Sequence, residues 1–380
     1  MNRLWNEFLA ENYRNESKFN EAWGAYAENE TWGGISCEPG ADEWQNPRFF
    51  DFNWFRSGLV ERWINKNLEG IKEGNPDALA TVGFLQNEWP ADKFLPTEKL
   101  SFSNTHYHGP FERFSPIFKL TDRRFRGQGF SVGEFGAWGA HEARSHGQFK
   151  DESELSIRHF LAVGHETLGL GGSLMMNWDL KDMNECVFPW GLTYMQGGNS
   201  MEETVPKDWL DAYGKMSSLF RQLEPVYESP QLFFVIPDNH RFGARSQRIH
   251  EALHQALTML FACHVNFGVL NEKAIAELPP GVKALIWPIP YSPDDEVFEK
   301  IVGFVENGGQ LYVSGGIGFD PQRRPTRNHR YEQLGFPFQE PSTPFSTDIS
   351  TEHREFVISS VGKGTVYFMP VPIEMQSSDN

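Results

Sequence analysis

Gln128-Gly129-Phe130-Ser131-Val132-Gly133-Glu134 is the stretch that indicates the fold: a short apolar strand with glycines, ending in a carboxylate. Similar strands are predicted on both sides of it, at 78–85, 99–104 and 172–176. Segments with helical spacing of apolar residues lie among them, at 115–126, 153–168 and 208–222. Strands that alternate with helices predict a parallel sheet. Each strand ends in polar or aromatic residues, as at the active-site rim of a β/α barrel.

Two helices precede these strands. Apolar residues at helical spacing predict a first helical stretch from Leu4 to Tyr26 and a long amphipathic helix over 52–73. A loop over 31–47, rich in Gly, Pro and Trp, separates them. An eight-stranded barrel needs four more strands than the four predicted, so we expect either a half-barrel or four strands encoded upstream of Met1.

The region after Pro230 predicts a second α/β unit. Pro225 and Pro230 bracket a short linker, so we place a barrel domain at 1–228 and a second domain at 229–380. Strands at 231–236, 265–270, 282–288 and 310–316, with helices at 245–260 and 294–307, fit a flavodoxin-like doubly wound order. Two late strands, at 356–358 and 364–369, are expected at its edge.

Composition excludes several classes of protein. The chain has 380 residues and a net charge of −17, which argues against nucleic acid and against anionic membranes as partners. Three widely separated cysteines form neither a disulfide framework nor a zinc-ligand spacing. No apolar run approaches the ~18 residues of a membrane span, and the first residues begin a helix, not a signal peptide, so a cytoplasmic location is predicted. The 12 tryptophans suit either sugar-binding clefts or large mixed cores.

Glu134 is the strongest catalytic candidate, because a carboxylate at the end of a buried strand is costly unless it is used or paired. The alternative is a structural ion pair with Arg124 or Arg144. Glu88 follows the first strand and could act as a proton donor, as a substrate contact or structurally. A span of 134 − 88 = 46 residues fits two βα units but not three.

Other residues at strand ends are expected to contact a ligand. His106 and His108 lack a third ligand at metal spacing, so hydrogen bonding to Glu134 or to a sugar hydroxyl is favoured over zinc, and neither metal nor cofactor is predicted. Trp178 offers either a flat face for a sugar ring or a core side chain. The full set of expected substrate contacts is Asn87, His106, Tyr107, His108, Trp138, Trp178 and Asp179.

The second unit resembles class I glutamine amidotransferases in its strand pattern but has no cysteine at the strand-to-helix turn. Ser314 lies at that turn without the Gly-x-Ser-x-Gly elbow. Cys263 lies in an apolar run and is expected in the core. We therefore expect this unit to be catalytically silent, with a hydrolase that uses Ser314 or Cys263 as the alternative.

Taken in order, these features resemble the family 42 β-galactosidases of the Glu/Glu barrel clan. The residues that carry the resemblance are Leu4–Leu9, Phe19–Gly24, Asn46–Pro47, Phe52 with Phe55–Ser57, Val132–Glu134 and Trp178. The resemblance implies a retaining glycosidase that acts on terminal β-galactosides without a cofactor, with Glu134 as nucleophile. It also implies that residues from 231 to about 320 form a trimerisation domain that has lost its catalytic residues.

In that family an Asn-Glu acid/base precedes the opening helix, whereas by this alignment Asn87-Glu88 lies on strand five. We therefore expect the gene to encode four more strands upstream, with an Asn-Glu pair before Leu4. On this view, residues 1–380 alone hydrolyse nothing measurably, or depend on a partner for that half. The alternative reading is an inactive carbohydrate-binding or assembly protein of the same fold.

Overall fold

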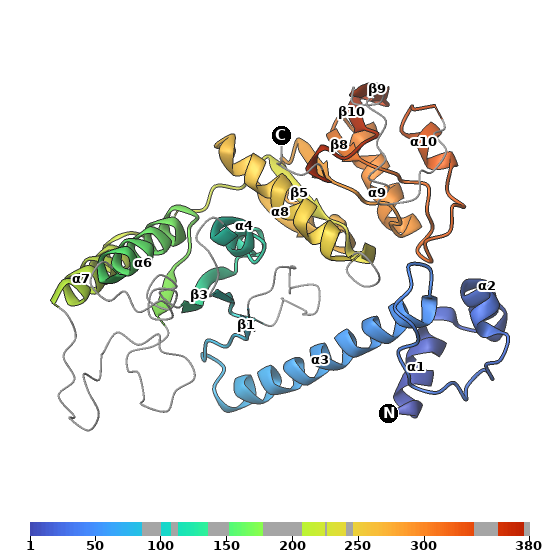
Figure 1. Ribbon diagram of the computed structural model, residues 1–380, viewed down its shortest axis with the longest axis horizontal. Helices are drawn as coiled ribbons and strands as arrows, with labels where there is room; N and C mark the ends of the chain where they lie inside the picture. The colour runs from blue at the N-terminus through green and yellow to red at the C-terminus, as the bar shows by residue number, and fades with distance from the viewer. Residues whose placement is uncertain are drawn as a thin grey trace. The chain divides into compact units, whose positions relative to one another are not determined.

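The computed structural model describes residues 1–85, 100–107, 113–135, 152–177, 207–224, 226–240, 246–337 and 356–375. Within them the chain is a mixed α/β protein with two sheets, one of four strands and one of six (Figure 1). It forms two compact units. The described residues of 1–65 and 230–380 make the first, and those of 66–229 make the second.

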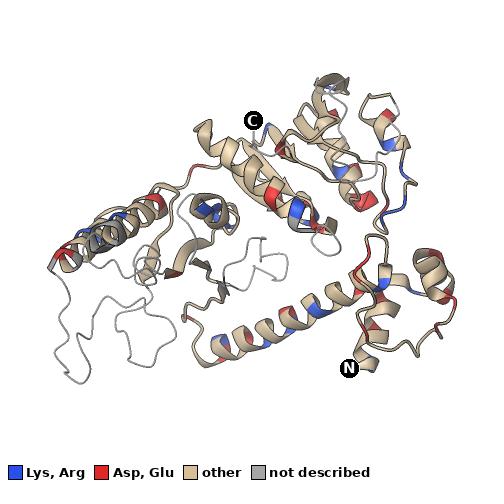
Figure 2. Cartoon of the chain, in the orientation of Figure 1, with Lys and Arg blue, Asp and Glu red and all other residues tan. Residues whose placement is uncertain are grey.

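Three helices open the chain: α1 (Asn2–Tyr13), α2 (Glu16–Trp23) and α3 (Pro47–Gly74). α1, α2 and the part of α3 up to Asn65 belong to the first unit. Asn15 caps α2, since its side chain accepts a hydrogen bond from the Lys18 amide at 3.0 Å. Acidic and basic side chains are interspersed along α3 (Figure 2). Aromatic side chains join the helices in one buried cluster, whose fully or nearly buried members are Trp5, Leu9, Phe19, Trp23, Ala27, Ile35 and Phe55.

The six-stranded sheet completes this unit. Its strands are β5 (Leu232–Ile236), β6 (Gly268–Asn271), β7 (Ala284–Trp287), β8 (Gln310–Ser314), β9 (Val357–Val361) and β10 (Gly364–Met369). The spatial order is β6-β5-β7-β8-β10-β9, and only β9 runs antiparallel to its neighbour. Helices α8 (Ser246–Ala262) and α9 (Asp295–Glu306) connect β5 to β6 and β7 to β8. Short helices fill the connections: η1 (Gly24–Ala27), η6 (Asp238–His240), η7 (Glu272–Glu277), α10 (His329–Gln333) and η9 (Ile373–Met375).

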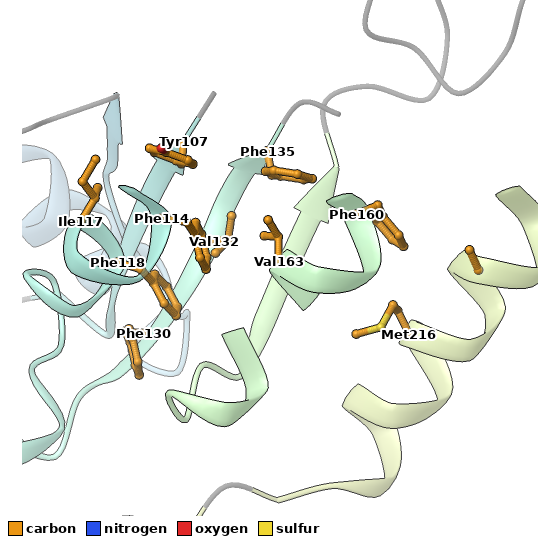
Figure 3. Close-up of a cluster of buried hydrophobic side chains, with 11 residues drawn as sticks. Tyr107, Phe114, Ile117, Phe118, Phe130, Val132, Phe135, Phe160, Val163 and Met216 are labelled. Atoms are coloured by element: carbon orange, nitrogen blue, oxygen red, sulfur yellow. The ribbon is translucent and has the colours of Figure 1, made fainter. Parts of the chain in front are cut away.

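The second unit is built on the four-stranded sheet. Its strands β1 (Gly83–Leu85), β2 (Phe102–Tyr107), β3 (Gly129–Phe135) and β4 (Leu174–Asn177) lie in chain order and pair in parallel. Its helices are α4 (Phe114–Lys119), η5 (Arg124–Arg126), α6 (Glu152–Gly169) and α7 (Lys207–Gln222). Apolar side chains from β2, β3, α4, α6 and α7 form its core (Figure 3).

The helices and strands predicted from periodicity are found within a few residues, with four instructive differences. The helix expected over 115–126 ends at Lys119, and 124–126 form the separate turn η5. The strand expected over 99–104 runs to Tyr107. The strand expected over 78–85 is confined to Gly83–Leu85. Of the two late strands, β9 lies at the edge, but β10 lies inside the sheet between β8 and β9. None of the described helices is long and apolar enough to cross a membrane.

Candidate active site at the ends of β2 and β3

The candidate site lies where β2 and β3 end side by side. These strands are parallel, so their carboxyl ends meet at one edge of the sheet. Their register pairs Thr105 with Val132 and then His106 with Glu134, so Gly133 is an extra residue on β3. This bulge brings the Glu134 side chain next to His106, because an inserted residue redirects the side chains that follow it.

Gly133 is the residue that makes the bulge possible. A Cβ atom at this position would lie 1.7 Å from Oδ1 of Asn104, the buried side chain on the neighbouring strand. Any other residue would therefore force Asn104 or the strand to move. Ser131, which lies on β3 like Gly133, donates a hydrogen bond from its Oγ to Asn104 Oδ1 at 3.2 Å.

Glu134 and His106 form the central contact. His106 Nδ1 lies 3.2 Å from Glu134 Oε2, and the two side chains are 21% and 20% exposed. Side chains with this exposure can be reached by a ligand, yet enough of each is covered to restrict its rotamers. An imidazole N–H at this distance can hold one carboxylate oxygen in place.

Close packing against β1 positions the imidazole. A Cβ atom on Gly83 would lie 2.4 Å from His106 Nε2, so the ring occupies the space that a side chain at Gly83 would fill. β1 and β2 are adjacent, with Leu85 in register with His106. Three neighbouring strands therefore contribute to the site: β1 makes room, β2 supplies the imidazole and β3 supplies the carboxylate.

Tyr107 lies on the opposite face of β2 from His106. Tyr107 is 3% exposed, and its ring makes an edge contact with that of Phe114 of α4, with ring centroids 5.6 Å apart (Figure 3). This corrects the expectation that Tyr107 contacts a ligand beside His106. The physical reason is that β2 continues through residue 107, and successive side chains on a strand point to opposite faces.

The remaining predicted site residues lie outside the described residues and stay predictions. They are Asn87, Glu88, His108, Trp138, Trp178 and Asp179. Of the two arginines named in the structural alternative for Glu134, Arg144 lies outside the described residues. Arg124 is committed to Asp122. Its Nε and Nη2 atoms lie 2.9 Å and 2.7 Å from the two Asp122 oxygens. Within the described part of the chain, no group of three His, Cys, Asp or Glu side chains could hold a metal ion.

Asn104, Ser131 and Gly83 are parts of the site that were not predicted. Asn104 and Ser131 look like ordinary interior polar residues in the sequence. For Asn104 the available signal was its position two residues before His106, because alternate strand residues share a face. Ser131, three residues before Glu134, shares a face with it only through the bulge at Gly133, which the alternation does not predict.

Ser314 and Cys263, the two alternative nucleophile candidates near the six-stranded sheet, lie in different environments. Ser314 is fully buried at the end of β8, where its hydroxyl donates to Glu374 and accepts from the Ile289 amide at 3.0 Å. Burial raises the pKa of Glu374. Cys263 is an exposed thiol just after α8, which corrects the expectation of a core cysteine. The buried hydroxyl is thus part of a structural network that substrates cannot reach.

Known proteins resemble this chain in fold and not in sequence. No family model matches it, and no curated protein matches its sequence. Solved structures do match its fold. A cold-adapted β-galactosidase from Rahnella sp. R3 superposes with a TM-score of 0.70 and 14% identity, over 96% of this chain and 62% of that one. A GH42 β-galactosidase from G. stearothermophilus gives a TM-score of 0.70, 12% identity, and 96% and 62% coverage.

A third matching structure is a mannosidase. The exo-β-1,4-mannosidase from Opitutaceae bacterium strain TAV5 superposes with a TM-score of 0.57 and 15% identity, over 84% of this chain and 65% of that one. The chain thus spans less than two thirds of the length of these three structures. At such low identity the likeness concerns the fold alone: this chain has a mixed α/β fold similar to part of the barrel glycoside hydrolases.

Proposed function

We propose that this protein is a retaining glycoside hydrolase with Glu134 as its nucleophile, acting on terminal β-galactosides without a cofactor. The observation that carries the proposal is the contact between Glu134 and His106 at the carboxyl edge of a parallel sheet. Catalytic residues lie at that edge in β/α barrels. The fold likeness to glycoside hydrolases adds support.

The proposed reaction has two steps. A Glu134 oxygen attacks the anomeric carbon while the glycosidic C–O bond breaks, and an acid protonates the departing oxygen. Water then hydrolyses the glycosyl ester, with the same acid group now taking the proton from water. Glu88 is proposed as a substrate contact or, alternatively, as this acid/base.

His106 is proposed as the positioning residue for Glu134. Holding Oε2 at Nδ1 leaves the carboxylate in one orientation, which a nucleophile needs to approach the anomeric carbon in line. Gly83 fixes the imidazole by the close approach of its backbone to the ring. His108, Trp138, Trp178, Asn87 and Asp179 are proposed to contact the sugar.

The six-stranded sheet and its helices are proposed to serve assembly, not catalysis. In space its first four strands lie in the order β6-β5-β7-β8, so the second strand in the chain precedes the first. This is the order of doubly wound, flavodoxin-like sheets, and it supports an amidotransferase-like domain over 229–380. Ser314 is buried, so a substrate cannot reach its hydroxyl, which supports the proposal that Ser314 is not a nucleophile. We propose that this domain makes the protein a homotrimer and that the protein is cytoplasmic.

The test is covalent trapping with 2-deoxy-2-fluoro-β-galactosyl fluoride, followed by intact mass and peptide mapping. Fluoride leaves without protonation, so the label reports on the nucleophile independently of the acid/base. Wild type and the exposed-helix control Glu73→Gln should gain one fluorosugar on Glu134, whereas Glu134→Gln should gain none. A label on another residue, or equal labelling of Glu134→Gln, would show that Glu134 is not the nucleophile.

The same experiment separates the enzyme from a non-catalytic carbohydrate-binding protein. Glucosyl and mannosyl analogues tested in parallel identify the sugar, since one of the matching structures is a mannosidase. A chain that binds galactose in calorimetry but takes no label from any analogue would favour the non-catalytic alternative.

A further inference from the structure

The six-stranded sheet has a point at which the chain order reverses. From β5 the chain crosses to β6 on one side and then to β7 on the other. The carboxyl ends of β5 and β7 therefore lie side by side at one edge of the sheet. Open parallel sheets bind ligands in the crevice at such a point, outside the carboxyl ends of the strands.

Trp44 lies at this reversal point, although it comes from the loop before α3. Its ring stacks on His240, which follows β5, with centroids 5.5 Å apart and planes 11° apart. His240 is 1% exposed, and its Nε2 lies 2.9 Å from the carbonyl oxygen of Pro290, which follows β7. The imidazole thus bridges the two loops and presents a face to Trp44.

Arg323, from the loop after β8, also contacts the Trp44 ring. Its guanidinium carbon is 4.0 Å from the ring centroid of Trp44 and 4.0 Å from that of Phe50. The side chain is 1% exposed and donates to the carbonyl oxygens of Trp44 and Asn239, at 3.2 Å and 2.7 Å. A guanidinium against an aromatic ring is attracted by the ring quadrupole, and more strongly when both are desolvated.

Local contacts hold the Trp44 segment in this position. Gln45 Nε2 donates to the Arg323 carbonyl at 2.9 Å, so the two segments exchange hydrogen bonds in both directions. Asn46 is buried and donates to the Ala41 carbonyl at 2.8 Å, which closes a turn around Trp44. Trp44 as a residue is partly exposed, whereas its indole Nε1 is buried.

The charge state of the site limits what it can bind. Burial and the nearby guanidinium of Arg323 hold the pKa of His240 well below its usual value, so the imidazole is neutral at pH 7. A neutral stacked ring and one cation together favour a flat, electron-rich aromatic ring without positive charge.

We propose that His240 and Arg323, beside the ends of β5 and β8, form a binding slot for a planar, electron-rich aromatic ring, and that Trp44 occupies it as a ligand built into the chain. An external ligand must then displace Trp44 to enter. This inference is independent of the chemistry proposed for Glu134, which lies in the other unit.

The test uses the full chain with Trp44→Gly, which empties the slot, and indole as the probe. Thermal unfolding of wild type should not respond to indole. Trp44→Gly should unfold at a lower temperature, and indole should raise its midpoint in proportion to the logarithm of indole concentration. Adding Arg323→Met to Trp44→Gly should weaken the indole response, because the cation is gone.

Trp54→Gly is the matched control, since Trp54 is also half-buried and has the Lys273 ammonium 4.1 Å from its ring centroid, but comes from a helix. Equal indole responses of Trp44→Gly and Trp54→Gly would overturn the proposal, as would no response of Trp44→Gly.

If Trp44→Gly does not fold alone, refolding with indole becomes the readout. Recovery of the wild-type circular dichroism spectrum only with indole would support the slot, and failure to recover would contradict it. Trp44→Phe, which keeps a ring in place, should fold and remain insensitive to indole.

Discussion

The distance from Gly133 to Asn104 is the tightest steric constraint at the candidate site. Alanine at 133 would place its Cβ 1.7 Å from the buried amide oxygen of Asn104, so β3 or Asn104 must shift. We expect Gly133→Ala to lower the free energy of unfolding by about 1–3 kcal/mol, as overpacked sites do. Urea unfolding of Gly133→Ala, with and without Asn104→Ala, is the measurement.

The double variant is expected to recover part of the loss, since the clashing amide is removed. Gly70→Ala in α3 is the control, because nothing lies within 4 Å of a Cβ there. It should be neutral or stabilising, because alanine favours helix over glycine. Loss of stability in Gly70→Ala equal to that in Gly133→Ala would show that the steric argument is wrong.

His106 is expected to affect the rate of trapping without being needed for the fold. His106→Ala removes the contact that orients Glu134 and should slow labelling by the fluorosugar roughly 10- to 100-fold, since a misplaced reacting group costs rates of this order. His106→Gln, which keeps a donor, should retain more of the rate. Unchanged labelling of His106→Ala, with wild-type unfolding, would remove His106 from the mechanism.

At the scale of elements, one carboxylate joins the three N-terminal helices. Asp51 of α3 accepts hydrogen bonds at the same oxygen from Tyr13 of α1 at 2.6 Å and from Trp23 of α2 at 2.8 Å. Burial raises the pKa of Asp51 to about 6, well above its usual value in water, and the two hydrogen bonds offset part of this effect. Its ionisation therefore opposes folding.

The sign of the pH effect follows from this shift. A folded-state pKa above the unfolded one means that Asp51 favours folding fully below about pH 4, and that this contribution is lost as the pH rises through 6. Asp51→Asn keeps an acceptor oxygen but cannot ionise. Its stability relative to wild type should therefore increase between pH 4 and pH 7 in urea unfolding.

Asp77→Asn, in the exposed turn after α3, is the matched substitution and should show no such trend. A difference between Asp51→Asn and wild type that stays constant from pH 4 to pH 7 would contradict the assignment of this carboxylate.

At the scale of the whole molecule, the described residues of 1–65 and of 230–380 share one compact unit. Arg324 donates to the Glu21 carbonyl at 2.8 Å, and Arg323 donates to the Trp44 carbonyl. These hydrogen bonds join the C-terminal part of the unit to its N-terminal part. Removing residues after 229 would therefore expose the packed face of the N-terminal helices. Assembly is better tested on the intact chain.

We expect light scattering of the full chain at micromolar concentration to give three times the 43.5 kDa chain mass. Dilution should shift the mass only at concentrations near the dissociation constant. A mass of one chain across the range would contradict the proposed trimer.

The sequence by itself determined the features that depend on neighbouring residues. Hydrophobic periodicity identified most helices and strands, and the run from Gly129 to Glu134 located the carboxylate at a strand end, because strand patterning and glycine breaks are local. The same patterns did not fix where each element ends. β2 continues to Tyr107, three residues beyond the predicted end, and so Tyr107 lies in the core and not at the site.

Tertiary structure alone decided which distant residues meet. The register of β2 and β3 brings His106 to Glu134, and packing of the loop before α3 brings Trp44 to His240 and Arg323. Such contacts join residues tens to hundreds of positions apart, and no local propensity encodes them. They follow from the free energy of burying apolar and aromatic surface over the whole chain.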